Sequence, residues 1–84
     1  MLERGNVVKS LAGRDKGKLL VIMQADGLCV FVSDGKERPV NRPKSKNIRH
    51  LSGALASIDE DQMRGNRALR KALGRLSAEI NGNT

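Results

Sequence analysis

A short charged run between two glycines carries chemistry suited to a polyanion. Residues 13–18, here called the elbow, read Gly-Arg-Asp-Lys-Gly-Lys. A guanidinium makes paired hydrogen bonds to a phosphate, and an ammonium acts as a mobile point charge. Gly13 and Gly17 free the backbone for a tight reversal. The elbow therefore offers three candidate phosphate ligands: Arg14, Lys16 and Lys18.

A second basic segment, residues 42–50, is here called the basic strip. It reads RPKSKNIRH, so five of its nine positions are basic when His50 is counted. Lysines on an edge strand also discourage unwanted strand pairing, which is the alternative explanation for this run. Five basic residues exceed what that protection requires. We therefore predict that the strip binds together with the elbow through Arg42, Lys44, Lys46 and Arg49.

Other kinds of site do not fit these residues. The nucleoside-triphosphate loop needs four residues between its glycines and a Ser or Thr after its Lys. The elbow has three residues between its glycines, and Leu19 follows Lys18. One Cys and one His do not make a four-ligand metal site. The sequence thus supports no catalytic residue, metal, cofactor or small-molecule substrate.

The composition indicates how a nucleic acid would be read. The 84 residues carry a formal net charge of +7, with no Trp, no Tyr and one Phe. Residues 1–50 hold 11 Lys and Arg against 5 acids, whereas residues 51–84 hold 5 against 4. Without stacking rings, a basic protein contacts phosphate, sugar and shape rather than base sequence. The lack of aromatic rings also argues against a methyl-lysine reader, because such a protein needs an aromatic cage.

Apolar runs predict strands on both sides of the elbow, and in residues 19–23 the apolar side chains occupy both faces, which predicts a strand covered on both sides. A short strand is expected at Val7 and Val8, a second over residues 19–23 and a third over residues 28–32. Asp26-Gly27 predicts a two-residue hairpin turn between the last two. Asp15 is expected to stand out at the tip of the elbow with the cations.

The remaining strands are expected after a second turn. Asp34-Gly35 predicts that turn, and residues 36–40 predict a brief strand whose Pro39 suits an edge. The basic strip then follows as an edge strand or extended tail.

One amphipathic helix is expected at the C-terminal end. Ser57 and Glu60 have the spacing of a capping box, so the helix is predicted from about residue 58 to about residue 80, ending near Asn81-Gly82. Its apolar stripe is expected to cover Cys29 and Phe31 on the third strand, leaving both buried. The stripe contains Leu69, Ala72, Leu73, Leu76 and Ile80, and Arg64, Arg67, Lys71 and Arg75 lie opposite it.

These elements predict one domain, with residues 1–52 as the β part and residues 53–84 as a helix of the same unit. The lone Cys29 suits a reducing cytosol. No run approaches the roughly 18 apolar residues of a membrane span, and a secretory signal is not expected. We therefore expect a cytoplasmic protein without membrane contact.

Between Gly5 and Leu51 the chain resembles KOW-motif proteins. The matching residues include the elbow with Ala12, Gly5 and Val8 before it, and Val21-Ile22 after it. Asp34-Gly35, Val40 and Arg42 also match. A further match, outside the short motif, is Asn47-Ile48-Arg49-His50-Leu51. These residues are similar to the fourteen-e and twenty-seven-e types of large-subunit ribosomal protein and to their small bacterial relatives.

The resemblance implies a mainly β fold, an SH3-like five-stranded barrel with one C-terminal helix packed against it. It also implies binding of structured RNA, ribosomal RNA first, with ribosomal proteins as further partners. The RNA contacts of the family carry over to Arg14, Lys16, Lys18, Arg42, Lys44, Asn47, Arg49 and His50. Leu19-Leu20 stands where a further glycine often follows the Lys-Gly pair, and a single, nearly neutral helix replaces the long helical or basic extensions of the ribosomal members. A protein-interaction module of the translation or transcription machinery and a DNA-binding protein remain open alternatives.

Overall fold

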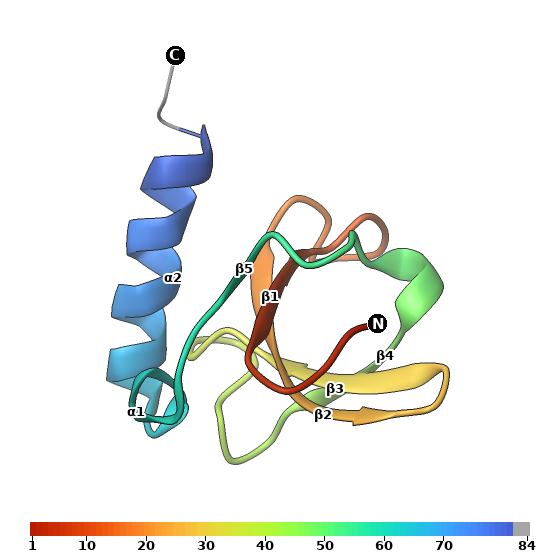
Figure 1. Ribbon diagram of the computed structural model, residues 1–84, viewed down its shortest axis with the longest axis horizontal. Coiled ribbons are helices and arrows are strands. Elements are labelled where there is room, and N and C mark those ends of the chain that lie inside the picture. The colour runs from red at the N-terminus through yellow and green to blue at the C-terminus, as the bar shows by residue number, and fades with distance from the viewer. Residues whose placement is uncertain (82–84) are drawn as a thin grey trace.

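Five antiparallel strands and a C-terminal helix form the molecule (Figure 1). The computed structural model describes residues 1–81. The strands are β1 (Asn6–Lys9), β2 (Leu19–Asp26), β3 (Cys29–Ser33), β4 (Lys44–Asn47) and β5 (Ala56–Ser57), in the sheet order β4-β3-β2-β1-β5. A 3₁₀ helix (Ile48–His50) follows β4, and α1 (Glu60–Met63) and α2 (Asn66–Asn81) follow β5. Between residues 1 and 81, no helix is long and apolar enough to cross a membrane.

Strand β2 has apolar side chains on both faces because both faces of the sheet are covered. On one face Val8, Leu20 and Ile22 pack with side chains of β3 and with Leu51. On the other face Leu19 and Val21 pack with residues of β1, α1 and α2. Full burial of side chains such as Leu20 and Ile22 stabilises the fold by about 1.5–3 kcal/mol each. The central strand therefore joins two cores.

Helix α2 covers β1 and β2, and the prediction that it covers Cys29 and Phe31 on β3 is wrong. Leu69 and Leu73 are buried against Val7 and Val21, with Leu76 packed beside them. Cys29 is exposed and Phe31 is only partly buried. The reason is the chain path, because only two residues separate β5 from α1, and β5 pairs with β1. So short a connection places the helices over the β1 side of the sheet.

The capping box predicted from Ser57 is also wrong. Asp59 is the N-cap: its carboxylate accepts from the Gln62 amide at 3.0 Å, and the Gln62 side chain accepts from the Asp59 amide at 3.0 Å. Ser57 belongs to β5, where its backbone pairs with Asn6. Residues 64 and 65 separate α1 from α2, so the predicted single helix is two. Gly82, at the predicted C-terminal end, lies outside the described residues.

Residues 36–40 form a loop rather than the predicted strand. The turn at Asp34-Gly35 is confirmed, with Gly35 at φ +81°. The Asp34 carboxylate accepts from the Lys36 amide at 2.8 Å and the Arg38 amide at 2.9 Å. A side chain that binds nearby amides competes with sheet pairing, which explains the loop.

Candidate nucleic-acid interface

The elbow is a closed, hydrogen-bonded loop between β1 and β2. Gly13 and Gly17 have φ values of +80° and +90°, as the glycine spacing predicts. The Ser10 amide donates to the Lys18 carbonyl at 2.9 Å, and the Gly17 amide donates to the Ser10 carbonyl at 2.8 Å. These bonds fix the base of the loop, so its exposed side chains project from a defined backbone.

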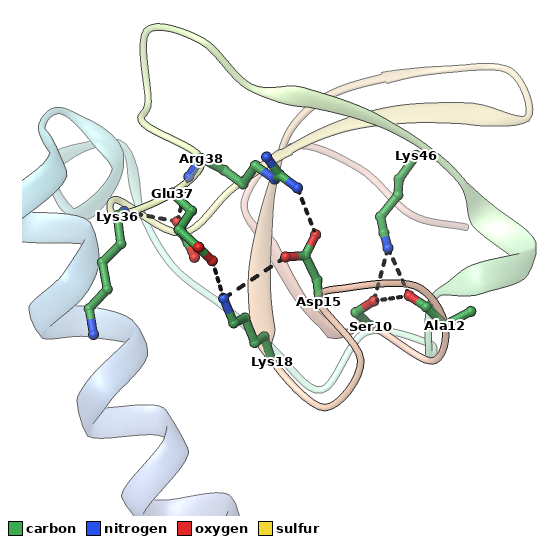
Figure 2. A network of polar contacts seen from close by, with 9 residues as sticks. Ser10, Ala12, Asp15, Lys18, Lys36, Glu37, Arg38 and Lys46 are labelled. Atoms are coloured by element: carbon green, nitrogen blue, oxygen red, sulfur yellow. Dashed lines mark hydrogen bonds and ion pairs between the residues drawn. The ribbon is translucent and has the colours of Figure 1, made fainter.

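Asp15 is buried beneath the elbow, and the prediction that it stands at the tip is wrong. Its side chain is only 4% exposed. The Arg38 guanidinium lies 3.5 Å from Asp15 Oδ2, and Lys18 Nζ lies 4.0 Å from Asp15 Oδ1 (Figure 2). Burial of a carboxylate requires such cationic partners, and Arg38 supplies one from a distant loop.

Lys18 forms ion pairs with acidic side chains of the protein itself. Its ammonium donates to Glu37, which also belongs to the loop after β3. This hydrogen bond lowers the pKa of Glu37 and raises the pKa of Lys18. Lys18 is therefore partly neutralised. The exposed cations left on the elbow are Arg14 and Lys16, neither of which forms an ion pair within residues 1–81.

Lys46 joins the basic strip to the elbow. From β4, its ammonium donates to Ser10 Oγ at 3.0 Å and to the Ala12 carbonyl at 3.1 Å (Figure 2). Ser10 Oγ in turn donates to the same carbonyl at 3.0 Å. Two segments that are more than 30 residues apart in sequence thus lie side by side. The role of Lys46 in this structure is to position the elbow.

The rest of the strip combines exposed cations with residues that shape the backbone. Asn47 Oδ1 accepts from the Arg49 amide at 2.8 Å and caps the 3₁₀ helix. The Leu11 amide donates to the His50 carbonyl at 2.8 Å, which holds this end of the strip beside the start of the elbow. Arg42 lies in the turn before β4, where its amide donates to Pro39. The exposed basic side chains of the strip are Arg42, Lys44, Arg49 and His50.

The geometry divides the predicted binding residues into two groups. Gly13, Gly17, Lys18, Lys46 and Asn47 maintain the shape of the surface, and the exposed cations face solvent. The ion pairs of Asp15 with Arg38 and of Lys18 with Glu37 were missed from the sequence. The only local signal for them is the cluster Lys36-Glu37-Arg38 directly after the Asp34-Gly35 turn.

Substitution of Lys46 by Met should loosen the elbow. The change removes two charge-assisted hydrogen bonds, each worth about 1.5–3 kcal/mol, and keeps most of the aliphatic stem. We expect native-state hydrogen exchange to show at least about tenfold lower protection of the Gly17 amide. Lys44→Met is the matched control, because Lys44 lies two residues away on the same strand and is exposed. Equal protection in both variants would show that Lys46 does not hold the elbow.

No protein-family model and no curated protein matches the chain. Its function is therefore inferred from the placement and chemistry of the residues described above.

Proposed function

We propose that this chain is a cytoplasmic, non-enzymatic RNA-binding protein of the KOW type that docks on the phosphates of structured RNA, ribosomal RNA first. The proposal assumes that the five-stranded sheet curls into an SH3-like barrel. The observation that carries it is the Lys46 bridge, which holds the elbow against the basic strip. We infer from this adjacency that the exposed cations of the two segments share one surface.

The mechanism is electrostatic docking on a preformed surface. Arg14 and Lys16 on the elbow, with Arg42, Lys44 and Arg49 on the strip, are exposed and available for phosphate oxygens. The hydrogen bonds of the elbow and the Asn47 cap keep the backbone in place, so little ordering is required on binding. Phe31 is the one Phe, Tyr or Trp of the chain, and it is partly buried. Contacts to the backbone and the shape of the RNA therefore dominate.

The salt dependence of binding tests this mechanism. If the exposed Arg14, Lys16, Arg42, Lys44 and Arg49 neutralise about five phosphates, log affinity should fall against log salt with a slope of about −3.5 to −4.5. Fluorescence anisotropy with a labelled ribosomal RNA hairpin, from low to moderate salt, measures the slope. A flat response would remove the proposal.

Cosedimentation tests the ribosomal partner. The protein should pellet with ribosomal subunits at low salt and leave them at high salt, because phosphate contacts are weakened by counterions. Association that survives high salt and ribonuclease would instead support the protein-interaction module.

A further inference from the structure

A cleft of about 290 Å³ lies between α2 and the base of the elbow. From α2 it is lined by Arg70, Leu73, Gly74 and Ser77. These positions have the spacing i, i+3, i+4 and i+7, so they form one stripe of the helix. Lys18 and Lys36 line the opposite side. The volume lies just below the roughly 300–1,000 Å³ typical of small-ligand sites.

The lining of the cleft combines cations with an apolar surface. Lys18, Lys36 and Arg70 are the cations, and Asp34 is the one acid in the lining. The Asp34 carboxylate already accepts from two backbone amides, and Lys18 also pairs with Glu37 outside the lining. Lys36 forms no ion pair among the described residues, and its side chain extends along α2 (Figure 2). A ligand with one anionic group and one flat apolar group suits this arrangement.

Arg70 is held in place at the edge of the cleft. Its Nη1 donates to the Gly35 carbonyl at 2.7 Å, while the residue as a whole stays exposed. A guanidinium fixed by one hydrogen bond retains a planar face and free donors. Unpaired RNA bases stack on guanidinium planes as well as on aromatic rings. Arg70 is therefore the candidate for a base-stacking surface in a chain that has no Trp or Tyr.

Gly74 keeps the cleft open. A glycine inside a helix costs about 1 kcal/mol relative to Ala, so its position calls for a physical reason. A Cβ added at Gly74 would meet no atom within 4 Å. Because Gly74 lies in the lining stripe, a longer side chain there would extend into the cleft.

We propose that this cleft receives a single unpaired nucleotide of the RNA, and this inference rests on the proposed RNA-binding function. The phosphate of the nucleotide lies against Lys36, the lysine of the lining that forms no ion pair among the described residues, and its base lies against the Arg70 guanidinium. The bound RNA thus crosses the elbow from the basic strip to α2. Recognition then requires a bulged or looped nucleotide at a set distance from a paired region.

Blocking the cleft at Gly74 tests the inference. The probes are an RNA hairpin with a one-nucleotide bulge, the same hairpin fully paired, and a nucleoside monophosphate. The wild-type protein should bind the bulged hairpin about tenfold more tightly than the paired one, an effect typical of one stacked base. Gly74→Leu should abolish this preference and leave affinity for the paired hairpin unchanged. Gly74→Ala is the control, because a single methyl group leaves most of the cleft empty and should keep the preference.

A second variant and the pattern of outcomes separate the two proposals. Lys36→Gln removes one cation from the lining and leaves the sequence of α2 unchanged. This variant should also reduce the preference for the bulged hairpin. Equal binding of both hairpins by the wild-type protein, or a preference that survives Gly74→Leu and Lys36→Gln, would overturn the cleft and leave RNA binding intact. Failure to bind either hairpin would overturn the proposed function itself. Binding of the free monophosphate without any preference for the bulge would assign the cleft to free nucleotides and contradict the inference.

Discussion

Replacement of Lys44 and Arg49 by Glu is expected to weaken binding of folded RNA about 100-fold or more at moderate salt. Each wild-type side chain is exposed on the strip, and a hydrogen bond between charged groups is worth about 1.5–3 kcal/mol. The variant loses two such contacts and places two carboxylates against phosphates. Anisotropy titrations at several salt concentrations should also show a shallower slope, by about 0.7–0.9 for each lost contact.

The control must change the net charge equally at another place. Lys71→Glu with Arg75→Glu does so, because both pairs lower the formal charge from +7 to +3. Lys71 and Arg75 are exposed on α2 outside the lining of the cleft, and α2 lies at the other end of the molecule from β4 (Figure 1). We expect this control to lose much less affinity. Similar losses in the two variants would mean that net charge, rather than the surface formed by the elbow and the strip, attracts the RNA.

Lys46 is left out of this test for a structural reason. Its ammonium is bound to Ser10 and Ala12, so a carboxylate at that position would disrupt the elbow as well as any contact with RNA. A loss of binding by a Lys46 variant would then have two causes. The exposed Lys44 and Arg49 avoid this ambiguity.

Strands β1, β2 and β3 and the elbow could be predicted because their signals are local, whereas β5 was not predicted. Apolar residues on both faces of the alternation in β2 indicated a strand covered on both sides, and two cores meet there. The spacing of Gly13 and Gly17 indicated a tight loop, and both have positive φ. Residues 42–50 were expected to form an edge strand or an extended tail, and residues 44–47 of this segment form β4 at an edge of the sheet.

The elements that were predicted wrongly depend on partners far away in the sequence. Asp59 and Gln62 satisfy the capping-box pattern as well as Ser57 and Glu60 do. Pairing of Ser57 with Asn6 in the sheet decides between the two, and no local pattern contains that pairing. Burial of Asp15 likewise depends on Arg38, which is 23 residues further along the chain.

The loop formed by residues 34–40 connects the elbow to the helix. Arg38 pairs with Asp15, and Glu37 accepts from Lys18, so one side of this loop is tied to the elbow. The other side is tied to α2, since the Val40 amide donates to Asn66 Oδ1 at 2.8 Å and Arg70 donates to the Gly35 carbonyl. The loop that replaces the predicted strand thus sets the distance between the elbow and α2, and with it the width of the cleft.

Gly35→Ala is therefore expected to lower the free energy of unfolding by about 3 kcal/mol. A Cβ at φ +81° costs about 1–2 kcal/mol in any surroundings. Here it would also lie 2.6 Å from the Asn66 carbonyl oxygen and 3.4 Å from the Arg70 amide nitrogen. Both are backbone atoms of α2 and cannot move aside cheaply, so overpacking adds about 1–3 kcal/mol. Urea denaturation followed by circular dichroism measures the change.

Gly27→Ala separates the backbone cost from the steric cost. Gly27 lies in the two-residue turn between β2 and β3, near the predicted Asp26-Gly27 position, with φ +65°. A Cβ there meets no atom within 4 Å, so only the backbone cost of about 1–2 kcal/mol remains. The excess loss in Gly35→Ala then measures how closely the 34–40 loop is packed on the start of α2. If the free energy of unfolding falls equally in both variants, the 34–40 loop moves away from α2 at no energetic cost. The close approach of Gly35 to α2 would then not fix the width of the cleft.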